Sequence, residues 1–413
     1  MRVALVTALG VSFVLSPGRV AFGQIAPQNR LTEAQALQQL ATYDPRLRAA
    51  RAKLDELRAA QIGRGVRANP TFTFSRESVG DVHDDFLLGR QELDVSGRLG
   101  RLRTAGRLAV DAAAADARYQ VVQVQAAVRD AFTVLLLAQE REAVVADGQK
   151  DLAKLLGILR TREQEGEGSR YDRMRGQRAL ADLEADLATA SAARAEAHGR
   201  LTVLLGLSTA HAVAADGRIE IAAPSPDAGV LVERALANRS DLQALTAAAS
   251  QYRAEQSAAD RLSIPTPTLS GGLKRSDIGP ESHSGYVLSL DLSVPLFNRG
   301  QAATALASAQ LTGAEAQATM LRHQIEAEVR VARAVFEIHR GKAERYLAST
   351  SGTADDLLAV ARLGYDEGEL GILELLDAVR QSLDGRVRTL EMLAAARRAS
   401  IELDRVIGME IKP

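Results

Sequence analysis

The chain has 413 residues, of which 46% are hydrophobic, 25% are charged and only 4% are aromatic, with a formal net charge of −1. This charge balance lacks the basic excess that nucleic-acid binders usually carry. Because the sequence contains no cysteine, disulfide scaffolds, thiol catalysis and Cys-ligated zinc or iron–sulfur sites are excluded. Its many Ala, Leu, Arg and Glu residues are typical of long packed helices.

Residues 1–23 have the pattern of a secretory signal peptide. A charged start at Arg2 is followed by an apolar run over residues 3–15, and the small residues Ala21 and Gly23 precede Gln24. We therefore expect an exported protein. No later run approaches the length of apolar sequence that a transmembrane helix needs, so we expect no helical membrane span.

Two long stretches without proline, residues 71–223 and 296–412, predict long helices, because proline is nearly absent from helix interiors. Leucines in the first stretch and apolar residues in the second are spaced at i, i+3, i+4 and i+7: Leu152, Leu155, Leu156 and Leu159, then Ile372, Leu376, Val379 and Leu383. Such stripes indicate helices packed lengthwise on partners. Residues 100–163 alone would form a rod roughly 95 Å long.

The two stretches resemble each other, which indicates an internal duplication. The tripeptide at 165–167 recurs at 367–369, and Asn69-Pro70 corresponds to Thr266-Pro267. We therefore divide the chain into the signal peptide at 1–23, a first repeat at 24–222 and a second repeat at 223–413. The Pro-rich segment 222–227 is the expected joint.

Each repeat also contains a β-hairpin, predicted at about 71–95 and about 268–294, with polar turns at 80–85 and 276–283. The clearest strand places one set of residues on a single face: Tyr286, Leu288, Leu290, Leu292 and Val294. Strands of about nine residues suit a membrane-spanning barrel, and equally a small soluble sheet that covers helix ends. An open sheet in lipid would leave backbone groups unpaired, so several chains would have to close the barrel, three of them giving twelve strands.

This order of duplicated helix, hairpin, long helix and returning helix resembles the TolC family of trimeric outer-membrane efflux channels. Segments 31–37, 68–70, 93–98 and 293–301 echo its CzcC-like cobalt–zinc–cadmium branch, although Gly300 stands where that branch often has Asn. The resemblance implies a mainly α fold with membrane β: long helical hairpins and four strands per chain. It also implies a homotrimer with a twelve-stranded barrel in outer-membrane lipid and a helical tunnel through the periplasm.

The resemblance implies a passive duct that exports divalent heavy-metal cations. Its expected partners are a periplasmic adaptor (membrane fusion) protein and an inner-membrane pump of the resistance-nodulation-division class. A multidrug or type I secretion channel is an alternative, and a periplasmic coiled-coil adaptor is an alternative of another class. We expect no enzyme and no cofactor, since the sequence lacks nucleotide-binding, metalloprotease and nucleophile-elbow motifs.

Two segments near 165–171 and 366–372 interrupt the helices with glycine, which supplies the freedom to reverse the chain. We call them the periplasmic tips. The resemblance implies that they contact the adaptor, although glycine can also serve only to make the turn. The residues are Gly166, Glu167, Gly168, Ser169, Gly368, Glu369, Leu370 and Gly371.

Just beyond the second tip, Glu374 and Asp377 are three residues apart and share a helix face. The resemblance implies a periplasmic gate here, where a trimer would place six carboxylates around its axis and so favour cations. The matching part of the first repeat holds Asp172 and Arg175, which could latch neighbouring helices. An ordinary solvated face explains the same residues.

Two histidines, His83 and His283, lie in the predicted hairpin turns among acidic residues. Imidazole and carboxylate suit zinc and cobalt, so a weak metal site at the exit side is conceivable. Solvated polar loops are the favoured interpretation, and we assign no metal ligand.

Overall fold

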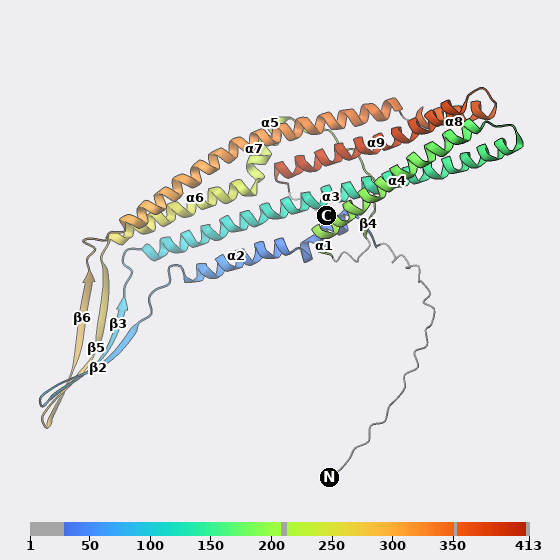
Figure 1. Cartoon of the computed structure of the whole chain (residues 1–413). Helices are drawn as coiled ribbons and strands as arrows, with labels where there is room; N and C mark the ends of the chain where they lie inside the picture. Colours follow the sequence, from blue (N-terminus) through green and yellow to red (C-terminus); the bar gives the residue numbers. More distant parts are fainter. Residues whose placement is uncertain (1–28, 208–212, 351–352, 410–413) are drawn as a thin grey trace, which may run out of the picture.

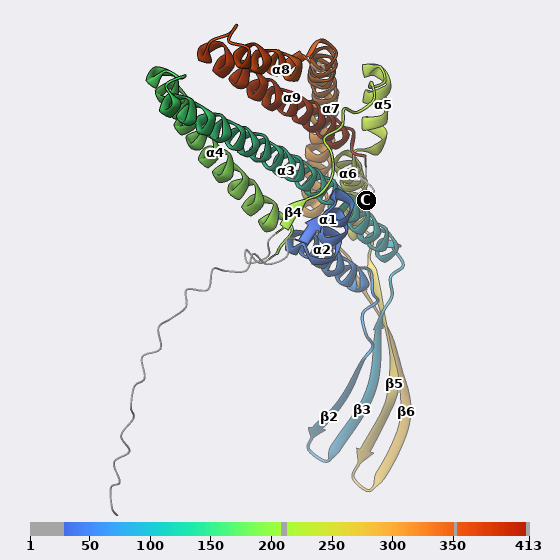
Figure 2. The ribbon, with the colours of Figure 1, turned by 90° about the vertical axis from the view of Figure 1, so that its right-hand side faces the viewer.

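The computed structural model describes residues 29–207, 213–350 and 353–409 (Figure 1). The predicted signal peptide therefore lies outside the described residues. Long helices run side by side along one direction, and a four-stranded sheet extends from one end of them (Figures 1 and 2). The helical hairpins reverse at the opposite end.

The first repeat begins with β1 (Asn29–Leu31), α1 (Glu33–Tyr43) and α2 (Pro45–Gly63). The hairpin β2 (Thr71–Val79) and β3 (Val82–Glu92) follows, then α3 (Arg98–Glu165), α4 (Arg170–Leu204) and β4 (Val213–Ala215). Helix α3 has 68 residues, which at a rise of about 1.5 Å per residue makes a rod of about 100 Å. The predicted long helix is confirmed.

The second repeat has the same order: α5 (Ala228–Asn238), α6 (Ser240–Ala259) and a 3₁₀ turn η1 (Asp260–Ser263), then β5 (Thr266–Ile278) and β6 (Glu281–Ser293). Its long arm is assigned as two helices, α7 (Gln301–Thr350) and α8 (Thr353–Asp366), before α9 (Ile372–Ile407) returns.

Helix α3 is the one helix in the described part of the chain that is long and apolar enough to cross a membrane by composition alone. Of its most apolar stretch, 56% is buried inside the protein. Because α3 packs against α1, α4 and α9, this burial fits a helix in the core of the bundle.

Each repeat has its own apolar core at the middle of the molecule. The first centres on Phe132 of α3, which is 1% exposed, and the second on Phe336 of α7, which is 2% exposed. A third cluster near the tips joins α3 to α8 and α9. There the predicted stripe on α9 is slightly rotated: Leu375, Ala378 and Ser382 are buried, whereas Leu376, Val379 and Leu383 are half-buried.

The four long strands form one antiparallel sheet in the order β2-β3-β5-β6. Their pairing shows that the predicted polar turns were too long: the breaks between strands are only residues 80–81 and 279–280. Polar residues stay in the ladder because cross-strand ion pairs hold them. Arg76 Nε lies 2.6 Å from Asp85 Oδ1, and Lys274 Nζ lies 2.8 Å from Asp84 Oδ2.

The helix junctions at the start of each repeat use an ion pair of reversed polarity. In the first, Asp44 caps α2 and lies 2.6 Å from Nη2 of Arg46. In the second, Arg239 holds the equivalent position and lies 2.6 Å from Oδ2 of Asp241. Both inner residues are 2% exposed.

The buried arginine has the larger set of partners. Its Nη1 donates to Glu328 Oε2 at 2.9 Å and to the Val406 carbonyl at 3.2 Å, and its guanidinium lies over the Tyr119 ring. Burial opposes the charge of Arg239, but the hydrogen bonds to Asp241 and Glu328 outweigh it and raise the pKa of the guanidinium. The junction thus joins α6, α7 and α9.

The predicted joint at 222–227 is an extended segment held on α7. Ser225 donates from its backbone N at 2.9 Å and from Oγ at 2.6 Å to Glu337 Oε1. These bonds hold the pKa of Glu337 at about 2, against partial burial that acts to raise it. The division of the chain into two repeats at residue 222 stays a prediction.

We expect Arg239→Ala to destabilise the fold by about 3–5 kcal/mol, because it leaves Asp241 and Glu328 without their buried partner. Arg253→Ala is the matched control: it removes an arginine whose pair with Glu315 is more than half exposed, and should cost less than ~1 kcal/mol. The thermal midpoint of helical circular dichroism in detergent measures both. Equal midpoints for the two variants would contradict a structural role for the Arg239 cluster.

Candidate functional site

The two tips share one backbone geometry. In the first, Gly166 has φ +80° and the amides of Glu167 and Gly168 both donate to the Arg162 carbonyl at 2.9 Å. In the second, Gly368 has φ +80° and the amides of Glu369 and Leu370 donate to the Gly364 carbonyl, at 2.8 and 3.0 Å. The repeated sequence at these positions therefore corresponds to a repeated pattern of backbone hydrogen bonds.

At each tip a large residue faces a glycine, and the positions of the two are reversed between the repeats. A Cβ on Gly168 would lie 2.9 Å from Arg162 Cβ, so only glycine fits opposite that arginine. In the second tip the small residue is Gly364, and the Leu370 side chain covers it. Gly166, Glu167, Ser169, Gly368, Glu369 and Gly371 are exposed, whereas Gly168 and Leu370 are half-buried.

The two tips are also linked to each other. The Arg162 guanidinium lies over the Tyr365 ring, 5.4 Å from its centroid. Burial raises the pKa of Tyr365 while the Arg162 charge lowers it, and the net shift is upward. Asp172 belongs to the same neighbourhood, since its charge also raises that pKa. No periodicity in the sequence signalled this contact, because a ring and a guanidinium meet here across separate hairpins.

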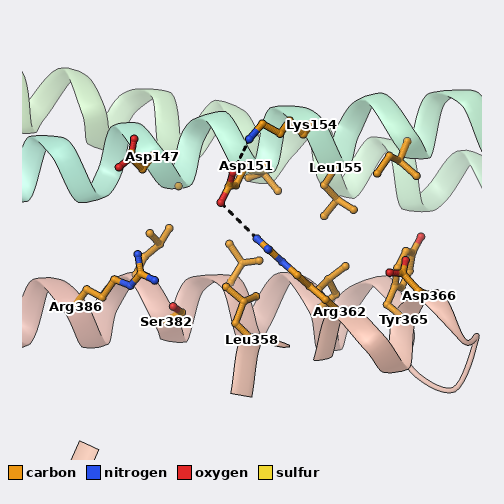
Figure 3. Close-up of a pocket in the computed structure, with 16 residues that line it drawn as sticks. Asp147, Asp151, Lys154, Leu155, Leu358, Arg362, Tyr365, Asp366, Ser382 and Arg386 are labelled. Atoms are coloured by element: carbon orange, nitrogen blue, oxygen red, sulfur yellow. Dashed lines mark hydrogen bonds and ion pairs between the residues drawn. The ribbon is translucent and has the colours of Figure 1, made fainter. Parts of the chain in front are cut away.

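A groove of about 340 Å³ runs between α3 and the α8–α9 hairpin (Figure 3). Asp151 lies at its centre, 3.1 Å from Lys154 on its own helix and 3.5 Å from Arg362 across the groove. Hydrogen bonding to Lys154 holds the pKa of Asp151 below its usual range. At its inner side, α3 and α9 approach closely: a Cβ on Gly148 would lie 2.6 Å from Leu383 Cδ2, so a larger residue there would displace the Leu383 side chain.

A second groove, of about 470 Å³, lies among α3, α4 and α9. It brings Arg175 and Asp377 to one surface. Arg175 Nε donates to Tyr171 at 3.0 Å, and Asp377 Oδ2 accepts from Gln381 at 2.7 Å, so each is bound on its own helix. Glu374 and Asp172 do not line this groove. The four predicted gate residues are thus near the tips but divided between neighbourhoods.

The sheet has one apolar and one polar face. The apolar face carries Phe72, Phe74, Leu87, Leu269, Leu273, Tyr286, Leu288, Leu290 and Leu292, aligned by the strand register. Tyr286, Leu288 and Leu290 are 85%, 72% and 66% exposed, and Val294 continues the run just past β6. Within the band Phe72 covers Gly89 and Leu288 covers Gly271. An exposed apolar band of this extent suits lipid.

The register separates the two histidines that the sequence placed together. His83 pairs with Ser78 and Asp277 on the apolar side of the sheet, whereas His283 pairs with Ser276 on the polar side. Both lie in strands rather than in turns. His83 Nδ1 is 2.8 Å from Ser78 Oγ, and His283 Nε2 is 3.4 Å from Glu281. Among the described residues no three potential ligand side chains cluster around a common point.

We expect Gly166→Ala to loosen the first tip, because a left-handed backbone costs an alanine about 1 kcal/mol or more. Gly157→Ala is the control: this glycine lies in the interior of α3 with open space around it, so alanine should stabilise the helix. Trypsin cleavage at Arg162 and Arg170 should be several-fold faster in the first variant and no faster in the second. Unchanged cleavage of Gly166→Ala would show that the turn is not under this constraint.

The sequence is similar to those of known proteins. Residues 231–409 match the family described as outer membrane efflux protein. The chain is 25% identical over 387 residues to the cobalt-zinc-cadmium resistance protein CzcC of Cupriavidus metallidurans, covering 92% of this chain and 90% of that protein.

Solved structures share the fold. The outer-membrane channel OprN is 22% identical with a TM-score of 0.72, and covers 92% of this chain and 91% of its own. CusC is 18% identical with a TM-score of 0.72, and covers 95% of this chain and 96% of its own. Residues 231–409 therefore match the outer membrane efflux protein family, and the chain is similar in sequence to CzcC and in fold to outer-membrane channels.

Proposed function

We propose that this channel, the outer-membrane component of a tripartite efflux system, exports divalent heavy-metal cations of the cobalt, zinc and cadmium type. The observation that carries the proposal is the likeness to a cobalt-zinc-cadmium resistance protein along nearly the whole length of both chains. Transport is passive, and the energy comes from an inner-membrane pump of the resistance-nodulation-division class.

The charge of the sheet supports a cationic cargo. Its polar face carries five carboxylates and two basic groups: Glu77, Asp84, Glu92, Glu281 and Asp291 with Arg90 and Lys274. If the apolar band faces lipid, this face lines the duct. A net negative lining raises the local concentration of cations.

The working unit is a homotrimer. In one chain the sheet has two open edges, β2 and β6, and lipid offers no hydrogen-bond partner for their backbone groups. Three copies joined edge to edge satisfy every edge and give twelve strands. The six helical hairpins then continue the barrel as a tunnel into the periplasm.

The tips are the contact surface for the periplasmic adaptor. They lie at the end of the helices farthest from the sheet (Figure 1). The exposed tip residues, Glu167 and Ser169 in one repeat and Glu369 in the other, give two kinds of contact site per chain. The side chains packed beneath the two turns differ, although the backbone turn is the same. We therefore expect the adaptor to dock on the two tips in two geometries.

The gate is formed by Glu374 and Asp377, with Asp172 and Arg175 as latching residues. Glu374 and Asp377 are exposed on the first turns of α9, where three chains would bring six carboxylates together. Their mutual repulsion resists closure and favours cations. Arg175 shares a groove with Asp377 and can supply compensating charge there.

A second candidate keeps the channel and changes the cargo to organic drugs or a secreted polypeptide. It is favoured by the fold shared with OprN and other outer-membrane channels. A periplasmic adaptor, with one helical hairpin between β-rich domains, does not fit the two hairpins and single membrane-type sheet of this chain.

Deleting the gene should make the host sensitive to divalent metals, and the gene in trans should restore growth. Zinc, cobalt, cadmium, nickel and copper are compared with a drug panel, with an unrelated porin deletion as control. Sensitivity to drugs alone would overturn the metal cargo while leaving the channel in place.

Replacing both Glu374 and Asp377 by Ala should raise single-channel conductance and lower cation preference, since charge and volume leave the constriction together. The isosteric double variant Glu374→Gln with Asp377→Asn separates these effects: it should lower cation preference with a smaller change in conductance. Planar-bilayer recordings in a salt gradient measure both. Currents equal to those of the wild type in both variants would remove these residues from the gate.

A further inference from the structure

On the apolar face of the sheet, the band ends sharply toward the hairpin turns. Its last row is continuous across all four strands, and the next row is polar across all four. The last apolar row consists of Phe74, Leu87, Leu273 and Tyr286, and the charged row that follows consists of Arg76, Asp85, Arg275 and Ser284. Two residues of extended strand, about 7 Å, separate the rows.

This charged row lies at the outer leaflet if the apolar band sits in lipid as proposed above. The hairpin turns are at the end of the sheet away from the helices (Figure 1). Because the helices extend into the periplasm, the turns face the outside. The row beyond the band is therefore at the depth of lipid headgroups, where Tyr286 also suits the interface.

The two arginines of the row are exposed and oriented. Their side chains are 61% and 60% exposed. Asp85 accepts hydrogen bonds from Nε and Nη2 of Arg76, at 2.6 and 2.5 Å, and Asp277 accepts one from Nε of Arg275, at 3.1 Å. Within the described ranges no acceptor is bonded to either Nη atom of Arg275. The carboxylates thus fix two guanidinium groups that still have N–H donors to offer.

A shallow depression joins the two rows. Its volume is about 210 Å³, and its lining combines apolar residues with an anionic, two cationic and one hydroxyl side chain: Phe74, Phe86, Leu87, Leu273 and Gly285 with Asp85, Lys274, Arg275 and Ser284. One edge therefore offers a cationic fork and a hydroxyl, and the other offers apolar surface that continues into the band. This is the pattern that an anionic amphiphile needs, since a guanidinium fork matches phosphate geometry.

We propose that this depression binds the phosphate group of a lipid in the outer leaflet. Arg275 and Ser284, which line the depression, donate to the phosphate oxygens. Arg76 adjoins them through its pair with Asp85 and offers a further donor, while the acyl chains lie along Leu288, Leu290 and Leu292. The site repeats in each subunit, so the trimer has three. The inference rests on the proposed insertion of the band in lipid and is independent of the exported ion.

The test is lipid retention by the purified detergent-solubilised trimer, followed by native mass spectrometry. Phosphatidic acid is the probe, and diacylglycerol with the same chains is the probe without phosphate. The wild type should retain phosphatidic acid over diacylglycerol, and the double variant Arg76→Gln with Arg275→Gln should lose about tenfold in retention. Arg90→Gln, on the opposite face of the same sheet, removes one positive charge away from the depression and should leave retention unchanged.

Full retention by the double variant, or an equal loss in Arg90→Gln, would overturn the site. Release of phosphatidic acid by EDTA, with the arginine variant binding normally, would assign binding to a cation bridge on the carboxylates and would also overturn it. Recovery of the trimer is checked for every variant, so a folding defect is recognised. A deletion strain without metal sensitivity would overturn the proposed cargo and leave the lipid result standing.

Discussion

Backbone groups at the edge of a sheet cannot remain unpaired in lipid, and this constraint governs the architecture. A single chain supplies only four long strands, in the order β2-β3-β5-β6, so both edges need a partner. Closure by identical copies is the simplest solution. In the barrel proposed above, the apolar face meets lipid and the polar face lines the duct, because alternate residues point to opposite faces. The helical hairpins, attached to the same strands, must follow the symmetry of the barrel.

The two repeats share their backbone turns, as an internal duplication predicts, but differ in the side chains at each contact. The junction uses Asp44 with Arg46 in one repeat and Arg239 with Asp241 in the other. The tips use a side chain at Arg162 or one at Leu370, each opposite a glycine. Such a contact needs one acid and one base, or one large and one small residue. Either member of the pair can stand at either of the two positions. Two similar hairpins with different surfaces result.

The two faces of the sheet differ in chemistry because alternate residues of each strand point to opposite faces. Toward the turns the apolar face ends at Arg76 and Arg275, while the polar face carries more carboxylates than basic groups. Ion pairs such as Asp84 with Lys274 let charged residues stay within the strands. Polar residues that resemble a loop in the sequence are therefore part of the ladder, and the strands reach their two-residue turns.

Periodicity and glycine placement in the sequence determined the long helices, the strand Tyr286–Val294 and the positions of both tips, because these depend on contacts close along the chain. Strand ends were not predictable, since cross-strand pairing decides them. The proximity of Arg162 to Tyr365, and of Gly148 to Leu383, joins residues about 200 positions apart or more. The separation of His83 from His283 likewise came only from the register. Local patterns fix which elements form, and tertiary packing decides which side chains meet.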